Sequence, residues 1–381
     1  MSARLLALLT LVTPAFAEDL SWTAKVTQGQ AVLDYLDAGA AVVLDPFPEK
    51  PTALPANQED QHLFALPPHL PTWQIQDYLR SKRDPAETPG PATRWLIAER
   101  HPEGGWRPTG QVRWPTGRST RTLERLQAAT PKGLGGLDQP RGLEDLVELG
   151  IGHATVNIHL SGLLHPENAP GRIPFSFEGR DYFLHAGWLR KLDRTIGFLT
   201  THRIVVSAII LVTPPRNGQR HLLTHPETTA EATLAMPNIS TPEGCHAFRA
   251  AIEFLAERYT REQAEHGRIS NWIAFNEVDQ AWTWTNMGEQ PMPRLMETYH
   301  RAMRLIHLGA RRYDPHARVF ASFTHHWFHA GDGRRTYRTR EMLKLLTRLS
   351  RAEGDFEWGV AYHPYPQNLR VGTTWQDTQP T

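Results

Sequence analysis

The sequence predicts an α/β fold: a TIM-barrel-like (β/α)8 domain that is preceded by a small β-rich region. From Lys132 onward, short apolar runs alternate with amphipathic helical segments, as in repeated β-α units around a parallel sheet. In front of this part, 13 prolines fall between Glu18 and Thr130, and proline is excluded from central strands and helix interiors. A barrel is the favoured closure of the sheet, and a doubly wound open sheet is the alternative.

The first β-α units follow directly on this change of texture. A short helix at 142–149 is ended by Gly150, and a strand follows at 154–160. The helix at 188–199 has an apolar stripe at helical spacing, and two prolines close the strand at 203–212 that follows it. The stripe consists of Leu189, Leu192, Ile196 and Leu199.

The later units repeat the pattern. Thr241 is an N-cap residue with Pro242 at the first helical position, and the helix that they begin has an apolar face. The run at 272–275 is the next strand. The apolar face of the helix that begins at Pro242 consists of Phe248, Ile252, Leu255 and Tyr259. After the strand at 272–275, helices at 295–313 and 341–352 lead to strands at 318–323 and 358–362.

The N-terminus has the pattern of a secretory signal peptide over residues 1–17. Arg4 supplies the positive charge, residues 5–12 the apolar core, and Ala15-Phe16-Ala17 the small-x-small cleavage site. We therefore expect an exported protein, periplasmic or extracellular. Residues 18–130 predict either a β-rich accessory region or an extension wrapped on the main domain, with short strands at 41–44 and 95–98.

Composition excludes several classes of partner. The formal net charge is +1 and the basic residues are scattered, so we expect neither nucleic acid nor an anionic membrane surface. The apolar run in the signal is too short for a membrane span, and no other run approaches that length. Cys245 is the only cysteine, which rules out an intramolecular disulfide. The Gly133–Gly136 segment lacks the spacing of a dinucleotide-binding loop.

The clearest sign of chemistry lies in residues 271–278. The run at 272–275 predicts a strand buried on both faces of a sheet, and Asn276 and Glu277 follow at its carboxyl end, where α/β barrels place catalytic groups. An apolar wall beside Glu277 would disfavour its ionised form and raise its pKa, as a general acid requires. Glu277 is thus a candidate catalytic carboxylate, and the alternative is a structural carboxylate at a helix start.

Two segments carry a resemblance to a known family. Residues 267–278 (GRISNWIAFNEV) and 358–369 (WGVAYHPYPQNL) resemble a bacterial family of exported proteins of unknown function, DUF5722. Residues 146–160 and 254–259 fit the same family, and the resemblance covers about residues 131–378. That family is itself similar to the clan-A (β/α)8 glycoside hydrolases, which carry an Asn-Glu pair at the end of strand four. The resemblance implies that Glu277 is the acid/base and that Asn276 binds the sugar 2-hydroxyl.

The resemblance also implies a second carboxylate. Retaining hydrolysis needs a nucleophile about 5–5.5 Å from the acid/base, and these hydrolases carry it at the end of strand seven. If the run at 272–275 is strand four, only two more strands and 19 residues after Tyr362 follow. We therefore expect a barrel of about six strands at 131–381 that is incomplete at its C-terminus, with the nucleophile beyond Thr381. Alternatively, the N-terminal region supplies the missing strands.

Other polar and aromatic residues at expected strand ends are candidates for substrate binding. Trp282 and Trp284 would lie on one face of an extended loop as a sugar platform, whereas Asp279 is interpreted as a loop carboxylate. His325, His326 and His329 suggest zinc, but no carboxylate stands at ligand spacing, so no metal is expected. The full set of binding candidates is Asn157, His159, Trp282, Trp284, His325, His326, Trp327, His363 and Tyr365.

The implied function is that of an exported, glycoside-hydrolase-like protein acting on a polysaccharide or glycoconjugate through acid/base catalysis by Glu277. One alternative is a non-catalytic carbohydrate-binding or envelope protein on the same barrel. Another is a metal-dependent hydrolase. The expected partner is a carbohydrate, with no cofactor and no membrane anchor.

Overall fold

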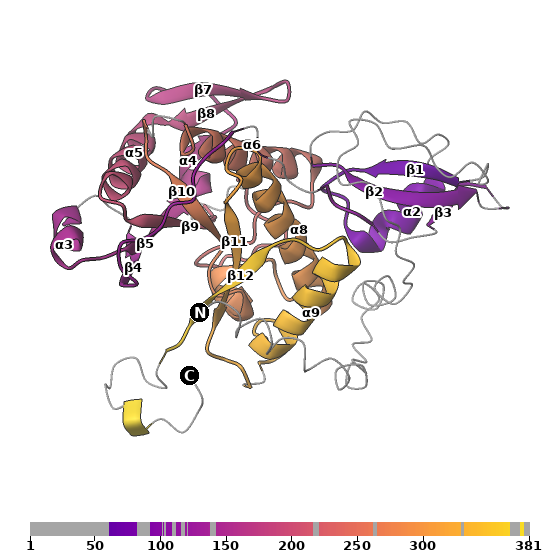
Figure 1. The fold of residues 1–381 in the computed structure, drawn as a ribbon. Coiled ribbons are helices and arrows are strands. Elements are labelled where there is room, and N and C mark those ends of the chain that lie inside the picture. The colour runs from indigo at the N-terminus through magenta and orange to yellow at the C-terminus, as the bar shows by residue number, and fades with distance from the viewer. Residues whose placement is uncertain are drawn as a thin grey trace.

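The structure, a computed structural model, describes residues 61–81, 92–100, 102, 104–108, 112–115, 119, 121–137, 142–215, 221–261, 265–328, 331–365 and 374–376. Its centre is a six-stranded sheet in which all neighbouring strands are parallel (Figure 1). From one edge to the other, the strands are β12 (Trp358–His363), β11 (Arg318–Thr324), β10 (Ile269–Ala274), β9 (Val205–Leu211), β5 (His153–His159) and β4 (Gly133–Leu137).

The strands stand in the sheet in the same order as along the chain. An α/β barrel grows in this way, by adding each strand at the same edge, whereas a doubly wound sheet reverses its order at a switch point. The predicted α/β fold with a parallel sheet is therefore present, wound as in a barrel. Within the described residues β12 and β4 remain sheet edges, so a closed eight-stranded barrel is not observed. The helices of the connections are α3 (Leu143–Glu148), α4 (Leu160–Leu163), α5 (Ala186–Thr201), α6 (Pro242–Arg258), α7 (Ala281–Trp284), α8 (Met292–Arg311) and α9 (Thr339–Ala352), with the 3-10 turn η2 (Val278–Gln280) preceding α7.

The helices and strands expected after residue 141 are all found, with ends shifted by three residues or fewer. Gly150 ends α3 with a φ of 65°, a conformation that favours glycine. Thr241 caps α6, because its side chain accepts a hydrogen bond of 3.1 Å from the Gly244 N–H. Among the described helices, none is long and apolar enough to cross a lipid bilayer.

Two parts of the fold lie outside the sequence-based expectations. The glycine-rich segment at 133–137 forms the edge strand β4, which pairs with β5 and makes β10 the fourth strand of the sheet. Between β5 and α5 along the chain, three strands also form a small antiparallel sheet in the order β6-β8-β7. Its strands are β6 (Leu164–His165), β7 (Arg172–Phe177) and β8 (Arg180–His185).

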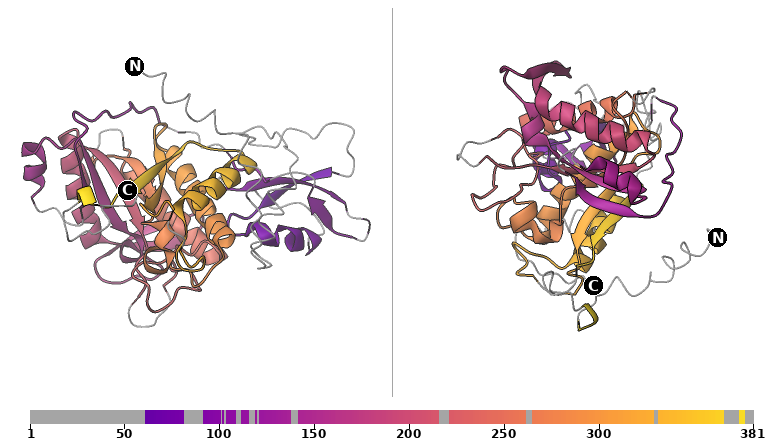
Figure 2. Two further views of the ribbon diagram at one scale, coloured as in Figure 1. Left: turned by 90° about the horizontal axis from the view of Figure 1, so that it is seen from below. Right: turned by 90° about the vertical axis from the view of Figure 1, so that its left-hand side faces the viewer.

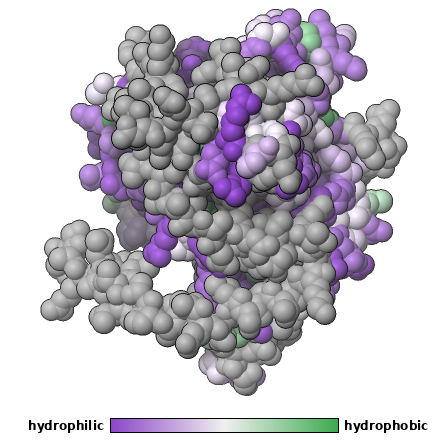
Figure 3. All heavy atoms as spheres, turned by 90° about the vertical axis from the view of Figure 1, so that its right-hand side faces the viewer, coloured by the Kyte–Doolittle hydropathy of each residue, from purple (hydrophilic) through white to green (hydrophobic). Residues whose placement is uncertain are grey.

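The described N-terminal residues form a separate three-stranded antiparallel sheet with its own apolar core. It lies at one end of the molecule, beside α8 and α9 (Figures 1 and 2). The strand expected at 95–98 lies in its middle strand, whereas the strand expected at 41–44 and the signal segment 1–17 lie outside the described residues. Described residues on this side of the molecule are mainly hydrophilic at the surface (Figure 3). The elements are β1 (Gln61–Leu66), η1 (Thr72–Gln74), α2 (Ile75–Ser81), β2 (Arg94–Arg100) and β3 (Trp106–Pro108); one further 3-10 turn, η3 (Thr374–Gln376), follows β12.

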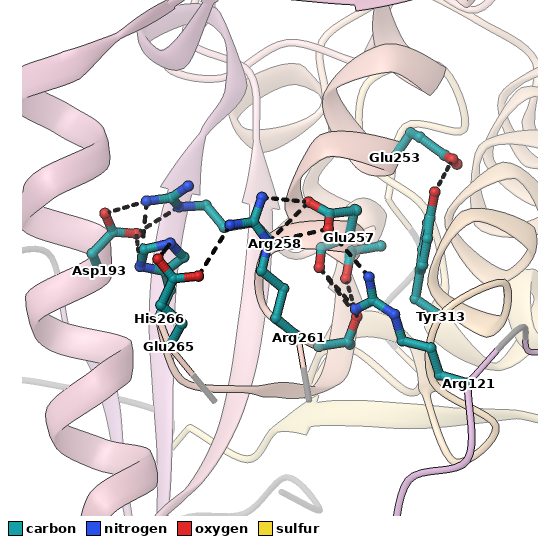
Figure 4. Close-up of polar contacts among 11 residues, drawn as sticks. Arg121, Asp193, Glu253, Glu257, Arg258, Arg261, Glu265, His266 and Tyr313 are labelled. Carbon is teal, nitrogen blue, oxygen red and sulfur yellow. Dashed lines mark hydrogen bonds and ion pairs between the residues drawn. The ribbon is translucent and has the colours of Figure 1, made fainter. Parts of the chain in front are cut away.

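A network of ion pairs holds the end of α6 that leads into β10 (Figure 4). Arg258 binds both carboxylate oxygens of Asp193 on α5, at 2.9 and 2.8 Å, and Tyr259 donates a further hydrogen bond to Asp193 at 3.0 Å. Beside them, Glu257 accepts from Arg121 and Arg261. This is the face where the strands begin, and in α/β barrels it serves stability and leaves the opposite face for chemistry.

Candidate functional site

The backbone is strained where β10 ends. Phe275 has a φ of 63° and Glu277 a φ of 42°, two of the five described non-glycine residues with positive φ. Such a conformation costs roughly 1–3 kcal/mol per residue and persists only where its surroundings enforce it. Phe275 is fixed between the rings of Phe248 and Tyr299. The fold thus gives up some stability to orient the Asn276-Glu277 pair.

The Glu277 side chain is buried and receives two donors on one oxygen. Tyr365 donates its hydroxyl to Glu277 Oε1 at 2.7 Å, and His363 Nδ1 lies 2.8 Å from the same atom. Both partners come from the end of β12, two strands away in the sheet. The structure therefore brings together three residues that were predicted separately, Glu277, His363 and Tyr365.

The expected direction of the Glu277 pKa is wrong. Burial does act to raise the pKa, as expected, but the hydrogen bonds from His363 and Tyr365 act against it, assisted by the charges of His363 and His326. The balance lowers the pKa of Glu277 below its ordinary value of 4.5. Near neutral pH Glu277 is therefore a carboxylate, ready to accept a proton or a hydrogen bond. Burial and this carboxylate together raise the pKa of the Tyr365 hydroxyl, which stays protonated as a donor.

Two residues that were not predicted hold Glu277 in place from behind. The Glu277 N–H donates to Ser322 Oγ at 3.0 Å. Tyr299 donates its hydroxyl to the Ala274 carbonyl at 2.9 Å and accepts from the Ser322 N–H at 3.1 Å, so it bridges the ends of β10 and β11. Ser322 had a signal in the sequence, as a polar residue inside an apolar strand. Tyr299 had none, because it reads as one more residue of a buried helix face.

Asp279 is a structural carboxylate. It is fully buried, and its Oδ1 accepts from the Thr324 N–H at 2.8 Å while Oδ2 accepts from the Thr324 hydroxyl and from Gln280 at 3.1 Å. Gln280 Nε2 also lies 2.6 Å from His326 Nδ1. Asp279 therefore fastens the η2 turn to the end of β11, and its oxygens are already engaged.

The remaining candidates near β10 and β11 differ in their placement. His325 stands edge-on to the Tyr365 ring at 6.0 Å, and His326 and Trp327 are half-buried in the same loop. The tryptophan platform is not formed as expected, because residues 281–284 are the helix α7, and side chains two apart in a helix point in different directions. Trp282 instead lies under the Arg335 guanidinium, 4.1 Å from its ring centre.

Asn157 and His159 lie farther along the sheet, on β5. His159 Nδ1 is 2.8 Å from the Thr213 hydroxyl, and both Asn157 and His159 line a cavity beside α5. Among the residues that the structure describes, no group of three His, Cys, Asp or Glu side chains is arranged to hold a metal ion. His329 of the suggested zinc set lies outside them.

Fold and site together define a class: an α/β protein with a barrel-type parallel sheet and a buried carboxylate at the end of its fourth strand. The chain belongs to the family of unknown function DUF5722, whose model matches residues 124–381. No curated protein gives a significant match. Among solved structures, the chain is similar to the family 1 β-glucosidase from Thermotoga maritima, with 12% sequence identity and a TM-score of 0.30. The match covers 58% of this chain and 52% of that chain, so the matched part spans about half of that enzyme.

Proposed function

We propose that this protein is an exported glycan-acting protein in which Glu277 is the reacting carboxylate. The observation that carries the proposal is the convergence of Tyr365 and His363 on one oxygen of a buried carboxylate, held on a strained backbone at a strand end. Strain of this kind clusters at functional sites, and the carboxyl ends of parallel strands are where such folds place them. The resemblance of the Asn-Glu segment to glycoside hydrolases supplies the reaction class.

In this proposal each residue of the site has a chemical task. Glu277 is ionised in the resting protein, so it is equipped to accept a proton from a water or a sugar hydroxyl. Tyr365 and His363 hold the carboxylate in one rotamer, and Asn276 beside it contacts the sugar. Retaining hydrolysis needs a second carboxylate about 5–5.5 Å away. Asp279 does not fill that role, because Thr324 and Gln280 occupy its oxygens.

The lowered pKa also favours a second candidate function, a glycan-binding protein without catalysis. An ionised carboxylate that is buried among donors is a strong acceptor for sugar hydroxyls, and such charge-assisted hydrogen bonds are about twice as strong as neutral ones. In that case Glu277 supplies affinity and no turnover.

Substitution of Glu277 by Gln separates the two functions, because Gln keeps the shape and removes the proton acceptor. We expect turnover of aryl glycosides and polysaccharides to fall roughly 10²-fold or more, while affinity changes little. The control is Glu265→Gln, which changes an exposed carboxylate that pairs with Arg261 at the opposite end of the sheet, where the strands begin. Unchanged turnover with a confirmed substrate would remove Glu277 from the catalytic role, and a large loss of affinity without any turnover would favour the binding protein.

The proposal includes export from the cell, which rests on the signal-peptide pattern of residues 4–17. N-terminal sequencing of the protein from its native host should begin at Glu18. An intact Met1 on that protein would contradict export by a cleaved signal.

A further inference from the structure

A cavity of about 160 Å³ lies between the end of β5 and the first half of α5. Both elements, with α4, stand on the same side of the molecule (Figure 1). Leu137, Val156 and Leu192 give the cavity an apolar wall, and Asn157 and His159 add polar groups. A few polar groups on an apolar wall are the usual make-up of a small-molecule site. A cavity of roughly 150 Å³ accommodates a six-membered ring.

Trp188 gives this cavity an aromatic wall. Its side chain lines the cavity and the residue is 37% exposed, which is high for an indole beside a core. The ring is held by the edge of His159, with ring centres 6.0 Å apart, and by Gly162, where a Cβ would come within 3.3 Å of the indole. An exposed, fixed indole offers a flat apolar face on which the C–H side of a sugar ring can pack.

Lys191 is the one cationic group among the residues lining the cavity. It is exposed and makes no hydrogen bond or ion pair with any part of the chain that the structure describes. The nearby carboxylate on α5, Asp193, does not compete for it, because both of its oxygens are bound by Arg258. The ammonium group is therefore available to a ligand that carries a negative charge.

The end of β5, which lines the cavity, is level with the end of β10, which precedes Glu277 in the chain. His159 pairs with Leu211 on β9, and Ile210 on β9 pairs with Ala274 on β10. Strands in a sheet lie about 4.8 Å apart, so the ends of β5 and β10 are about 10 Å apart. One glycan chain is long enough to span that separation.

We infer that this cavity is a binding subsite for a sugar unit that bears an anionic group, a uronate carboxylate or a sulfate, with Trp188 packing on the ring and Lys191 pairing with the anion. The inference rests on the proposed function, because it names the class of glycan on which Glu277 is proposed to act. The protein would then act on acidic glycans in preference to neutral ones.

The test measures binding of glucuronate, glucose 6-sulfate and glucose to the full chain by NMR titration, in the native protein and in Lys191→Met, Trp188→Ala and Arg190→Met. Arg190→Met removes the same charge one residue away, outside the cavity lining, and is the matched control. We expect at least one acidic sugar to bind about tenfold more tightly than glucose. Lys191→Met should abolish this preference, Trp188→Ala should weaken all three sugars, and Arg190→Met should change nothing.

The acidic sugar that binds identifies the anion as carboxylate or sulfate. Equal binding of acidic and neutral sugars, or loss of the preference in Arg190→Met, would overturn the inference. Repeating the titration with Glu277→Gln keeps it distinct from the proposed function, since the cavity should bind unchanged in that variant. Binding without turnover would then refute catalysis alone, and turnover of glycosides without binding in the cavity would refute the subsite alone.

Discussion

The ionisation of Glu277 is decided by its donors rather than by its burial. An apolar environment disfavours a carboxylate, and this is the largest single influence on the group. Two hydrogen bonds and nearby imidazoles together reverse its direction. A carboxylate whose folded pKa is depressed contributes stability that is present above its unfolded pKa and is lost as the pH falls through the folded value. The site should therefore be sensitive to acid and insensitive to moderate alkali.

Replacement of Tyr365 by Phe removes one of these donors and leaves the burial in place. The pKa of Glu277 should rise, so the acidic limb of the pH–activity or pH–binding profile should move to higher pH. A direct measurement is the carboxyl ¹³C chemical shift of Glu277, followed through a pH titration by NMR. Tyr362→Phe is the control, because alternation along β12 places Tyr362 on the face opposite to His363. An unchanged Glu277 titration in Tyr365→Phe would mean that this hydrogen bond does not set the pKa.

The sequence predicts where the site residues stand but not the environment that they create. The carboxyl ends of parallel strands meet at one edge of a sheet, so the sequence alone places Glu277 and His363 at the same edge. The direction of the pKa could not be predicted, because it depends on which atom of Tyr365 reaches which oxygen of Glu277. The geometry of Trp282 and Trp284 was missed because a four-residue helix has no periodic signal long enough to detect.

At the level of elements, long periodic segments were predicted well and short or unusual ones were not. The strands at 154–160 and 318–323 are rich in β-branched and aromatic residues, and both are found. β4 was missed because three of its five residues are glycine, which weakens any strand signal. The β7–β8 hairpin did have a sequence signal, because Glu178-Gly179 separates two strand-like runs. In the structure both of these residues have positive φ, as a tight hairpin turn requires.

The Tyr299 hydroxyl bridges the ends of β10 and β11, and the position of Glu277 depends on this bridge. In Tyr299→Phe the Ala274 carbonyl and the Ser322 N–H both lose a buried partner, which should lower the free energy of unfolding by about 1–3 kcal/mol. The end of β10 should also loosen, so turnover or glycan affinity should fall at temperatures where the protein stays folded. Urea unfolding and activity at matched stability measure the two effects.

Tyr259→Phe is the matched control for this prediction. Its hydroxyl is also a buried donor, but it binds Asp193 at the opposite end of the sheet, where the strands begin. It should destabilise the protein without altering the site. If both variants reduce activity in proportion to their loss of stability, Tyr299 has no role beyond folding.

At the scale of the whole molecule, two apolar cores are joined by buried polar contacts. Glu297 on α8 accepts hydrogen bonds from the N–H and hydroxyl of Thr72, at 3.0 and 2.9 Å, and from Arg301 at 2.7 Å. Arg301 in turn donates to the carbonyls of Pro68 and His69. Separating the N-terminal sheet from the helices would therefore break the hydrogen bonds that Thr72 donates to Glu297 and those that Arg301 donates to Pro68 and His69.

The sequence left open whether the N-terminal region is an independent accessory unit or an extension wrapped on the main domain. The Glu297 contacts connect the two parts, so amide hydrogen exchange can distinguish these two alternatives. If the region is an integral part of one cooperative unit, backbone amides of β2 and β10 should exchange with deuterium through the same global opening. Both sets should then report the same free energy of unfolding.

Glu297→Gln should destabilise that common unit, because it leaves the charge of Arg301 without its buried partner, and breaking a buried pair in this way costs about 3–5 kcal/mol. The protection of β2 and of β10 should fall by equal amounts. Glu289→Gln, which removes a carboxylate from an exposed pair with Arg335, should cost about 0–1 kcal/mol and serves as the control. Should β2 lose protection in Glu297→Gln while β10 keeps it, the N-terminal sheet unfolds on its own. The buried contacts would then be a docking surface between two independent domains.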